Sequence, residues 1–156
     1  MTTDERLAAL GITLPALSVP IANFAPAVRA GKLLFLSGQG PGDADGNPIT
    51  GKVGSKYSAD EARQHARLVG LRLLSIMQAE LGSLDRVVRI AKLFGMVNAV
   101  PEFTRHPYVI DGCSDLFAEV FPELGRHARS AVGMSSLPFD ITVEIEAIVE
   151  IREQTT

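Results

Sequence analysis

The segment "ITVEIEAIVEI", residues 141–151, decides the fold of this 156-residue chain. Apolar residues occupy every second position from Ile141 to Ile151, which is the period of a β-strand. The alternate positions carry a threonine, three glutamates and Ile148. An alternation of this kind places the apolar side chains against a hydrophobic core. The sequence therefore predicts a long closing strand with one buried face and one face that carries carboxylates.

Two helices are predicted upstream of this strand. The first begins after Ser58, because a glutamate three residues later completes a capping box, and it ends near Leu81–Gly82. The second is predicted over Asp111–Phe121, with Asp111 or Ser114 as the start signal. Apolar side chains recur every three or four residues in the first helix, which indicates one buried stripe.

Strand-like segments surround these helices. The predicted strand over residues 32–37 contains an apolar run without alternation, which favours burial on both faces. Pro26 interrupts the extended segment before it, and an interruption of this kind suits an edge strand or a bulge better than a central strand. Gly95 is a candidate for a bulge in a later strand. The remaining strands are predicted at about 87–96, 127–134 and 141–152.

The order of these elements defines the fold class. The pattern β-β-α-β-α-β-β predicts a single α+β domain, in which two main helices pack on one face of a mostly antiparallel sheet. Residues 1–156 form this one domain, and residues 1–20 are an N-terminal extension with a short helix from about Thr3 to Leu10.

Composition narrows the classes of function. Apolar residues make up 46% of the chain and charged residues 21%, as in ordinary globular proteins. The net charge of −3 provides no basic surface for nucleic acid or a membrane. Cys113 is the single cysteine, which we expect to be a buried structural residue rather than a nucleophile. The histidines and Cys113 lack the spacing of metal ligands, so we expect no metal site. The first residues lack the apolar run of a signal peptide, so we expect a cytoplasmic location.

The segment "HARSAVG", residues 127–133, contains the best candidate for ligand binding. Strand alternation places Arg129 on one face with His127, Ala131 and Gly133. Small neighbours leave room beside a guanidinium, and that group is well shaped to bind a carboxylate. The alternative is a structural ion pair between Arg129 and a glutamate of the closing strand. His127 is either a base in the pocket or a surface residue.

Three stretches together resemble the RidA/YjgF family, also called the L-PSP endoribonuclease family. They are "AGKLLFLSGQGP" (30–41), the capped helix after Ser58, and "ARSAVGMSSLPFDITVEIEAIVEI" (128–151). The resemblance extends from about residue 23 to residue 151. It implies a chorismate-mutase-like fold, a homotrimer and ligand clefts between subunits. It also implies hydrolysis of reactive 2-imino acids to 2-keto acids and ammonia, with no metal or organic cofactor.

The resemblance also assigns roles to individual residues. Arg129 falls on the family arginine that binds the substrate carboxylate, and Glu144 on the glutamate that positions or activates water. The other residues that it places in the cleft are Phe24, Ser37, Gly38, Gln39 and Ala131. Phe24 replaces a common tyrosine, Ala131 replaces a common cysteine, and the segment 98–117 holds extra residues.

These departures keep other functions open. A homotrimer that binds a small carboxylic acid without turnover is the alternative to a hydrolase. An endoribonuclease is a third hypothesis, which the acidic balance and the lack of a basic, aromatic surface disfavour.

Overall fold

A computed structural model describes residues 1–18 and 22–153 and confirms the α+β class. Five strands form one sheet in the order β1-β2-β5-β3-β4. All neighbouring pairs are antiparallel except β3 and β4, which are parallel. The strands are β1 (Ala27–Ala30), β2 (Leu33–Gln39), β3 (Val87–Asn98), β4 (Ala128–Met134) and β5 (Val143–Ile151). The edge position predicted for the segment after Pro26 is therefore confirmed for β1.

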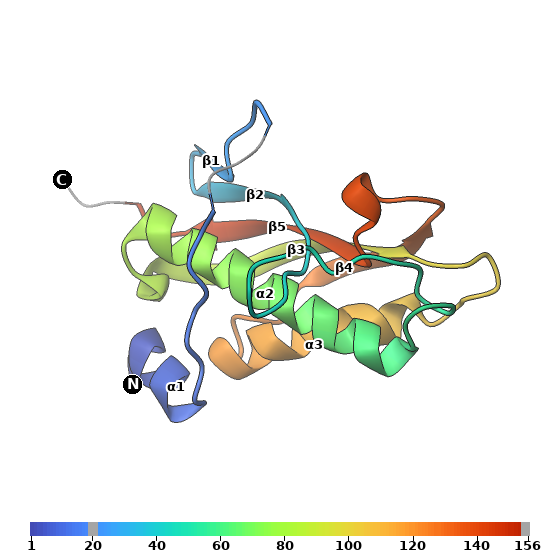
Figure 1. The fold of residues 1–156 in the computed structure, drawn as a ribbon. Helices are drawn as coiled ribbons and strands as arrows, with labels where there is room; N and C mark the ends of the chain where they lie inside the picture. Colours follow the sequence, from blue (N-terminus) through green and yellow to red (C-terminus); the bar gives the residue numbers. More distant parts are fainter. Residues whose placement is uncertain (19–21, 154–156) are drawn as a thin grey trace.

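Helices α2 (Ala59–Leu81) and α3 (His106–Val120) pack side by side on one face of the sheet, as Figure 1 shows. The Ser58 capping box is present, and Gly82 ends α2 with a left-handed φ of 78°. The short helix α1 (Thr3–Ala9) contacts α3 and the 3₁₀ turn η1 (Leu84–Arg86). A second 3₁₀ turn, η2 (Pro138–Asp140), precedes β5.

The predicted start of α3 is wrong by five residues. The helix begins at His106 rather than at Asp111, and Pro107 occupies its first turn. Proline is well tolerated there, because the N–H that it lacks would have no partner within the helix. Asp111 and Ser114 therefore lie inside the helix instead of capping it. This change gives both side chains a role in the candidate site.

Two predictions for the strands are also wrong. Only Leu34 and Leu36 of β2 are buried, whereas Leu33 and Phe35 are 37% and 41% exposed, because α2 and α3 cover a single face. Gly95 forms no bulge, since the register of β3 on β5 shifts before it, between Val87 and Arg89 and again before Lys92. A Cβ on Gly95 would lie 2.6 Å from Ile110, so this glycine lets α3 approach the sheet.

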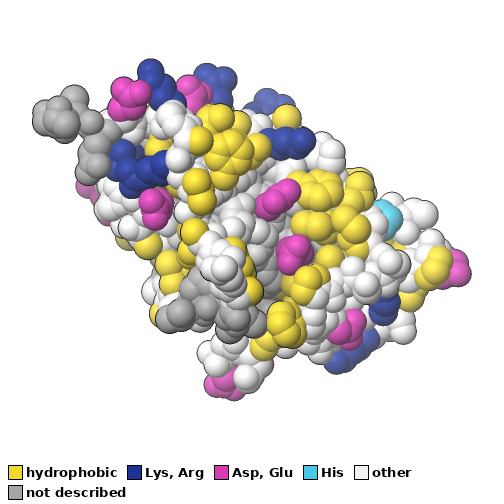
Figure 2. All heavy atoms as spheres, turned by 90° about the horizontal axis from the view of Figure 1, so that it is seen from above, with side chains coloured by type: hydrophobic (Ala, Val, Ile, Leu, Met, Phe, Trp, Pro, Cys, Tyr) yellow, Lys and Arg dark blue, Asp and Glu magenta, His cyan; other side chains and the backbone are white. Residues whose placement is uncertain are grey.

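The alternation in β5 follows the prediction. Val143, Ile145, Ala147, Val149 and Ile151 are buried beneath the helices. The opposite surface of the sheet, which we call the open face, includes Val28 and Phe35 beside the glutamates of β5. Figure 2 views the molecule from this side, where acidic side chains lie among hydrophobic ones. The described part of the chain thus presents a sheet with one covered and one uncovered face.

Candidate functional site

The structure brings Glu144 against the Ser37–Gln39 segment on the open face. The pairing of β2 with β5 becomes irregular between Leu36 and Gln39, where the segment bends past β5. A Cβ on Gly38 would lie 3.0 Å from the carboxyl carbon of Glu144. Glycine at this position therefore leaves the space that the Glu144 carboxyl occupies. Four of the predicted site residues, Ser37 to Gln39 and Glu144, thus form one cluster.

The segment that carries Phe24 is tied to the same cluster. The Ser37 hydroxyl donates a hydrogen bond of 2.6 Å to the carbonyl of Ala25, and its amide donates one of 2.9 Å to the carbonyl of Pro26. The side-chain amide of Gln39 (Nε2) donates a hydrogen bond of 3.3 Å to the Ser37 carbonyl. Phe24 is 48% exposed. Its side chain is therefore at the surface, and it offers no hydroxyl for proton transfer.

Glu144 has the electrostatic character of a proton acceptor. Its side chain is half-buried, and this burial raises the pKa of the carboxyl above the ordinary value of 4.5. The neighbouring charge of Glu146 on the same face raises it further. A carboxylate with a raised pKa accepts a proton from water more readily than an ordinary exposed one.

Arg129 is bound by residues of α3 on the covered side of the sheet. Its Nη1 donates to Asp111 Oδ1 at 2.7 Å and to Ser114 Oγ at 3.0 Å. Its Nη2 donates to the carbonyl of Pro107 at 3.4 Å. The structure therefore contains the ion pair that was the alternative for Arg129, but its partner is Asp111 and not a glutamate of β5.

Within one chain, Arg129 and Glu144 lie on opposite faces of the sheet. Leu93 of β3 pairs with Arg129 on one side and with Ala147 on the other, and Leu93 points into the core under the helices. Glu144 pairs with Met96, whose side chain has the opposite orientation. Ala131 shares the face of Arg129 and packs against the core. The two predicted catalytic side chains therefore form two separate half-sites in a single chain.

His127 belongs to the Arg129 half-site. Its Nδ1 lies 2.6 Å from the Gly125 carbonyl, and its Nε2 lies 2.9 Å from Ser114 Oγ. Because a carbonyl only accepts, Nδ1 carries the proton and the Ser114 hydroxyl donates to Nε2. Burial lowers the pKa of His127, which favours this neutral form.

Asp111 and Ser114 are residues of this half-site that the sequence pattern does not predict. The pattern predicts either of them as the start of α3, a position that would leave them no role as partners of Arg129. Their spacing of three residues was the available signal, because it places two side chains on one face of a helix.

The other reactive side chains do not join either half-site as nucleophiles or metal ligands. Cys113 is fully buried, and burial raises the pKa of its thiol far above the ordinary value. His65 is buried in α2 and its Nδ1 lies 3.0 Å from Thr142 Oγ1. Over residues 1–18 and 22–153, no group of three or more histidine, cysteine or acidic side chains has the arrangement to hold a metal ion. No helix in this part of the chain is long and apolar enough to cross a membrane.

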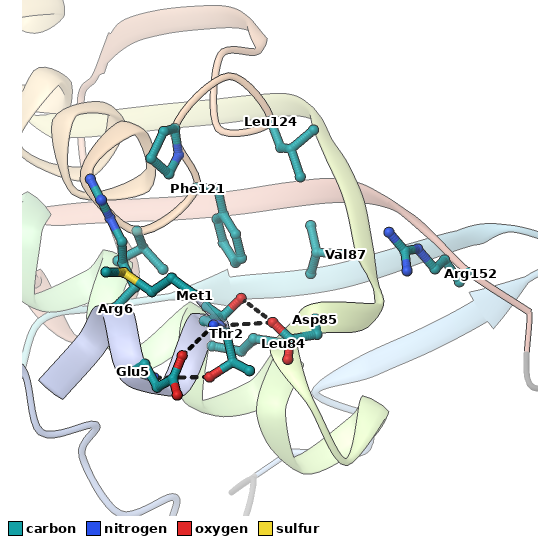
Figure 3. Close-up of a pocket in the computed structure, with 13 residues that line it drawn as sticks. Met1, Thr2, Glu5, Arg6, Leu84, Asp85, Val87, Phe121, Leu124 and Arg152 are labelled. Carbon is teal, nitrogen blue, oxygen red and sulfur yellow. Dashed lines mark hydrogen bonds between the residues drawn. The ribbon is translucent and has the colours of Figure 1, made fainter.

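Two hollows open on the surface of the described chain. One, of about 510 Å³, lies on the open face and is lined by Phe35, Ser37, Lys92 and Ile148, among others. The other, of about 570 Å³, lies beside α1 and is shown in Figure 3. There the Asp85 carboxylate accepts hydrogen bonds from the amide and hydroxyl of Thr3. None of the predicted site residues lines this second hollow, whereas the first contains Ser37.

The profile of one protein family covers most of the chain. It is described as "YjgF/chorismate mutase-like, putative endoribonuclease" and matches residues 4–150. The chain belongs to the RidA/YjgF family. The fold predicted from the RidA/YjgF resemblance is thereby confirmed, together with the family itself.

Relatives within the RidA/YjgF family carry different names. Protein TCP17 of Trypanosoma cruzi is 46% identical over 148 residues, which cover 94% of this chain and 92% of that protein. A protein of Dermatophagoides farinae named 2-iminobutanoate/2-iminopropanoate deaminase is 30% identical over 142 residues, covering 90% of this chain and 95% of that one.

Solved structures of the family superpose closely on this chain. Atu1372 from Agrobacterium tumefaciens, whose function is unknown, is 44% identical with a TM-score of 0.87, over 97% of this chain and 94% of that one. A structure from Shewanella oneidensis described as a putative endoribonuclease is 30% identical with a TM-score of 0.92, over 97% of this chain and all of the other.

Proposed function

We propose that this protein is a RidA-type hydrolase that deaminates a small imine or enamine carboxylic acid to a 2-keto acid and ammonia. The observation that carries the proposal is the half-buried Glu144 carboxyl, whose pKa is raised and which lies against the Ser37–Gln39 segment. The name of the Dermatophagoides farinae relative supports this choice of substrate class. Arg129 binds the substrate carboxylate, and Glu144 positions the water and accepts a proton from it.

The two half-sites require a second copy of the chain. Arg129 and Glu144 point to opposite faces of one sheet, so a substrate of a few carbon atoms cannot contact both within one chain. The strand that carries Arg129, β4, is an edge of the sheet, and the face that carries Glu144 is uncovered. We place the complete site in a cleft between neighbouring subunits of a homotrimer, where Arg129 of one copy meets Glu144 of the next.

The reaction needs only these two groups from the protein. A protonated imine is electrophilic, so water attacks C2 while Glu144 accepts one of its protons. The proton then passes from Glu144 to nitrogen, and the C–N bond breaks with ammonia as the leaving group. The hydroxyl gives its proton to the Glu144 carboxylate as the carbonyl of the keto acid forms, and ammonia takes up this proton and leaves as ammonium. Binding of the carboxylate by Arg129 orients C2 toward the water. Phe24 and Ala131 contribute shape and no proton.

Ammonia release from freshly generated 2-iminobutanoate tests the proposal. We expect the wild-type protein to accelerate release over the spontaneous reaction, and the single variants R129A and E144A each to lose this acceleration. Assemblies reconstituted from both variants together regain activity, because each mixed trimer contains one cleft with an intact Arg129 and an intact Glu144. Wild-type protein without acceleration would overturn the proposal, and inactive mixed trimers would overturn the two-subunit site.

A binding protein without turnover is the second candidate. The observation that favours it is the exposed side chain of Phe24, which offers no hydroxyl for proton transfer. Calorimetry with 2-oxobutanoate distinguishes the two functions. Binding that R129A abolishes, with no ammonia release from a panel of 2-imino acids, would favour the binding protein.

A further inference from the structure

The hydrogen bonds of Arg129 leave one edge of its guanidinium group for a ligand. Both hydrogens of Nη1 are used, one by Asp111 Oδ1 at 2.7 Å and one by Ser114 Oγ at 3.0 Å. Nη2 makes a longer bond of 3.4 Å to the Pro107 carbonyl. Nε donates to no acceptor among the described residues. The edge formed by Nε and Nη2 can therefore bind one carboxylate by donating two parallel hydrogen bonds, the geometry that arginine favours.

Hydrogen bonds among Arg129, Ser114 and His127 fix the position of this edge. Ser114 Oγ accepts from Arg129 and donates to His127 Nε2 at 2.9 Å, so the hydroxyl is fixed in direction. The Arg129 side chain is only 22% exposed, which limits its other conformations. The guanidinium is thus oriented before a ligand arrives, and this lowers the entropy lost on binding.

Asp111 places a negative charge on the same guanidinium, at its Nη1 end and not at the edge left for the ligand. Its side chain is 39% exposed and lies between two arginines, with Arg129 at 2.7 Å and Arg63 at 3.9 Å. Arg63 in turn pairs with Asp115 at 2.5 Å. These four groups balance one another in charge. A ligand with one carboxylate adds a single negative charge to the cluster, whereas a dicarboxylate adds a second charge that Asp111 repels.

We propose that Asp111 is the specificity-determining residue of the Arg129 half-site, and that it selects monocarboxylic 2-imino and 2-keto acids against dicarboxylic ones. It does so by holding Nη1, which leaves room for one carboxylate, and by repelling a second. This inference rests on the proposed function, because it assumes that Arg129 binds the ligand carboxylate. Asp111 acts on the ligand through its charge and through Arg129, so it is a positioning residue and not a catalytic one.

Calorimetric titrations with 2-oxobutanoate and 2-oxoglutarate test this selection. Asp111→Asn keeps an acceptor oxygen for Arg129 and removes the charge. We expect it to improve the affinity for 2-oxoglutarate relative to 2-oxobutanoate by about fivefold, as expected for removal of one nearby charge in a partly exposed site. Asp115→Asn is the matched control. It removes the same charge from the same helix, but beside Arg63, and should leave the ratio unchanged.

The outcomes separate failure of this inference from failure of the proposed function. The ratio of two affinities measured on one sample does not depend on the fraction of folded protein. An unchanged ratio in D111N, or an equal change in D111N and D115N, would overturn the role of Asp111 while leaving carboxylate binding intact. Wild-type protein that binds neither acid would instead remove the proposed function, and this inference with it.

Discussion

On the covered face of the sheet, polar side chains have hydrogen-bond partners and apolar side chains are buried within one chain. On the open face, large apolar side chains remain exposed. On the covered side, Arg129 is bonded to Asp111 and Ser114, and Leu93 beneath the helices is fully buried. On the open side, Phe35 and Val28 remain 41% and 56% exposed. The difference shows that folding of the described chain covers one face only, and it supports the proposed homotrimer, in which a second copy would cover the other.

The two half-sites differ in the same way as the two faces. A side chain on the covered face is held by partners from the same chain, so Arg129 is oriented before any ligand binds. Glu144 on the open face has an irregular strand and the small Gly38 beside it, and it lacks a described cationic partner. Contiguous apolar surface around such a group is typical of an interface between subunits.

A charge on the open face should have the largest effect, because it would lie in every subunit contact of the proposed homotrimer. Phe35→Glu places a carboxylate opposite Ile148 and Val28, the neighbours of Phe35 across the strands. We expect the assembly to weaken by about a thousandfold, since an unpaired charge buried in an apolar contact costs several kcal/mol. The isolated chain should remain folded, because Phe35 is not part of its core.

Sedimentation velocity and circular dichroism measure these two expectations. Leu68→Glu is the matched control, because Leu68 lies on α2 and is 37% exposed, close to the exposure of Phe35. We expect Leu68→Glu to leave the proposed assembly intact. An F35E protein that sediments like the wild type at all concentrations would contradict the difference between the faces.

A methyl group on the covered side should have the next largest effect. A Cβ on Gly112 of α3 would lie 2.0 Å from the carbonyl oxygen of Arg63 in α2. Both helices would have to move apart, since the clash is with backbone. We expect Gly112→Ala to reduce the free energy of unfolding by about 3 kcal/mol. Urea denaturation measures this loss, and a change below about 1 kcal/mol would show that the helices can separate easily.

The features of the fold that depend on local chemistry could be predicted from the sequence. The Ser58 capping box, the Gly82 end of α2 and the alternation in β5 are each decided by neighbouring residues. The burial of β2 could not be predicted in this way, because its apolar run is compatible with either one or two covered faces. In the described chain the helices cover only one of these faces.

The candidate site shows a similar division. Alternation relates the side chains within one strand, but it does not say which face of that strand meets the helices. In β5 the apolar positions settle the question, so Glu144 could be placed on the open face. In β4 the residues around Arg129 are small or polar on both faces, so its position depended on the parallel register with β3. Asp111 could not be found as its partner while it was considered the first residue of α3.

A methyl group on the open side should affect activity more than stability. A Cβ on Gly38 would lie 3.0 Å from the Glu144 carboxyl carbon, which belongs to a flexible side chain that can move away. We therefore expect Gly38→Ala to lower the rate of ammonia release about tenfold, equivalent to about 1.4 kcal/mol, by displacing the carboxylate. Its free energy of unfolding should change by less than about 1 kcal/mol. G38A and G112A thus form a pair, and equal losses of stability would remove the contrast between the faces.

The smallest expected effect is a pH-dependent gain in stability when Glu144 is neutralised. Burial and the charge of Glu146 raise the pKa of Glu144 in the folded state. The folded protein therefore binds this proton more tightly than the unfolded chain, and stability is lost as the pH rises through the folded pKa. Glu144→Gln carries no charge at any pH and avoids this loss. We expect its unfolding free energy at pH 8 to exceed that of the wild type by less than about 1 kcal/mol, since solvent screens a half-exposed group.

The pH profile separates this origin from a general change in packing. The advantage of E144Q should shrink as the pH falls toward 4.5, the ordinary value for the carboxyl, because the wild-type side chain becomes protonated. Glu146→Gln, on the more exposed neighbour, should stabilise the protein less and retain ammonia release. Thermal unfolding of both variants between pH 4.5 and 8 measures the difference. A gain in E144Q that is constant with pH would show that the folded chain accommodates the Glu144 charge without cost, as an exposed surface would.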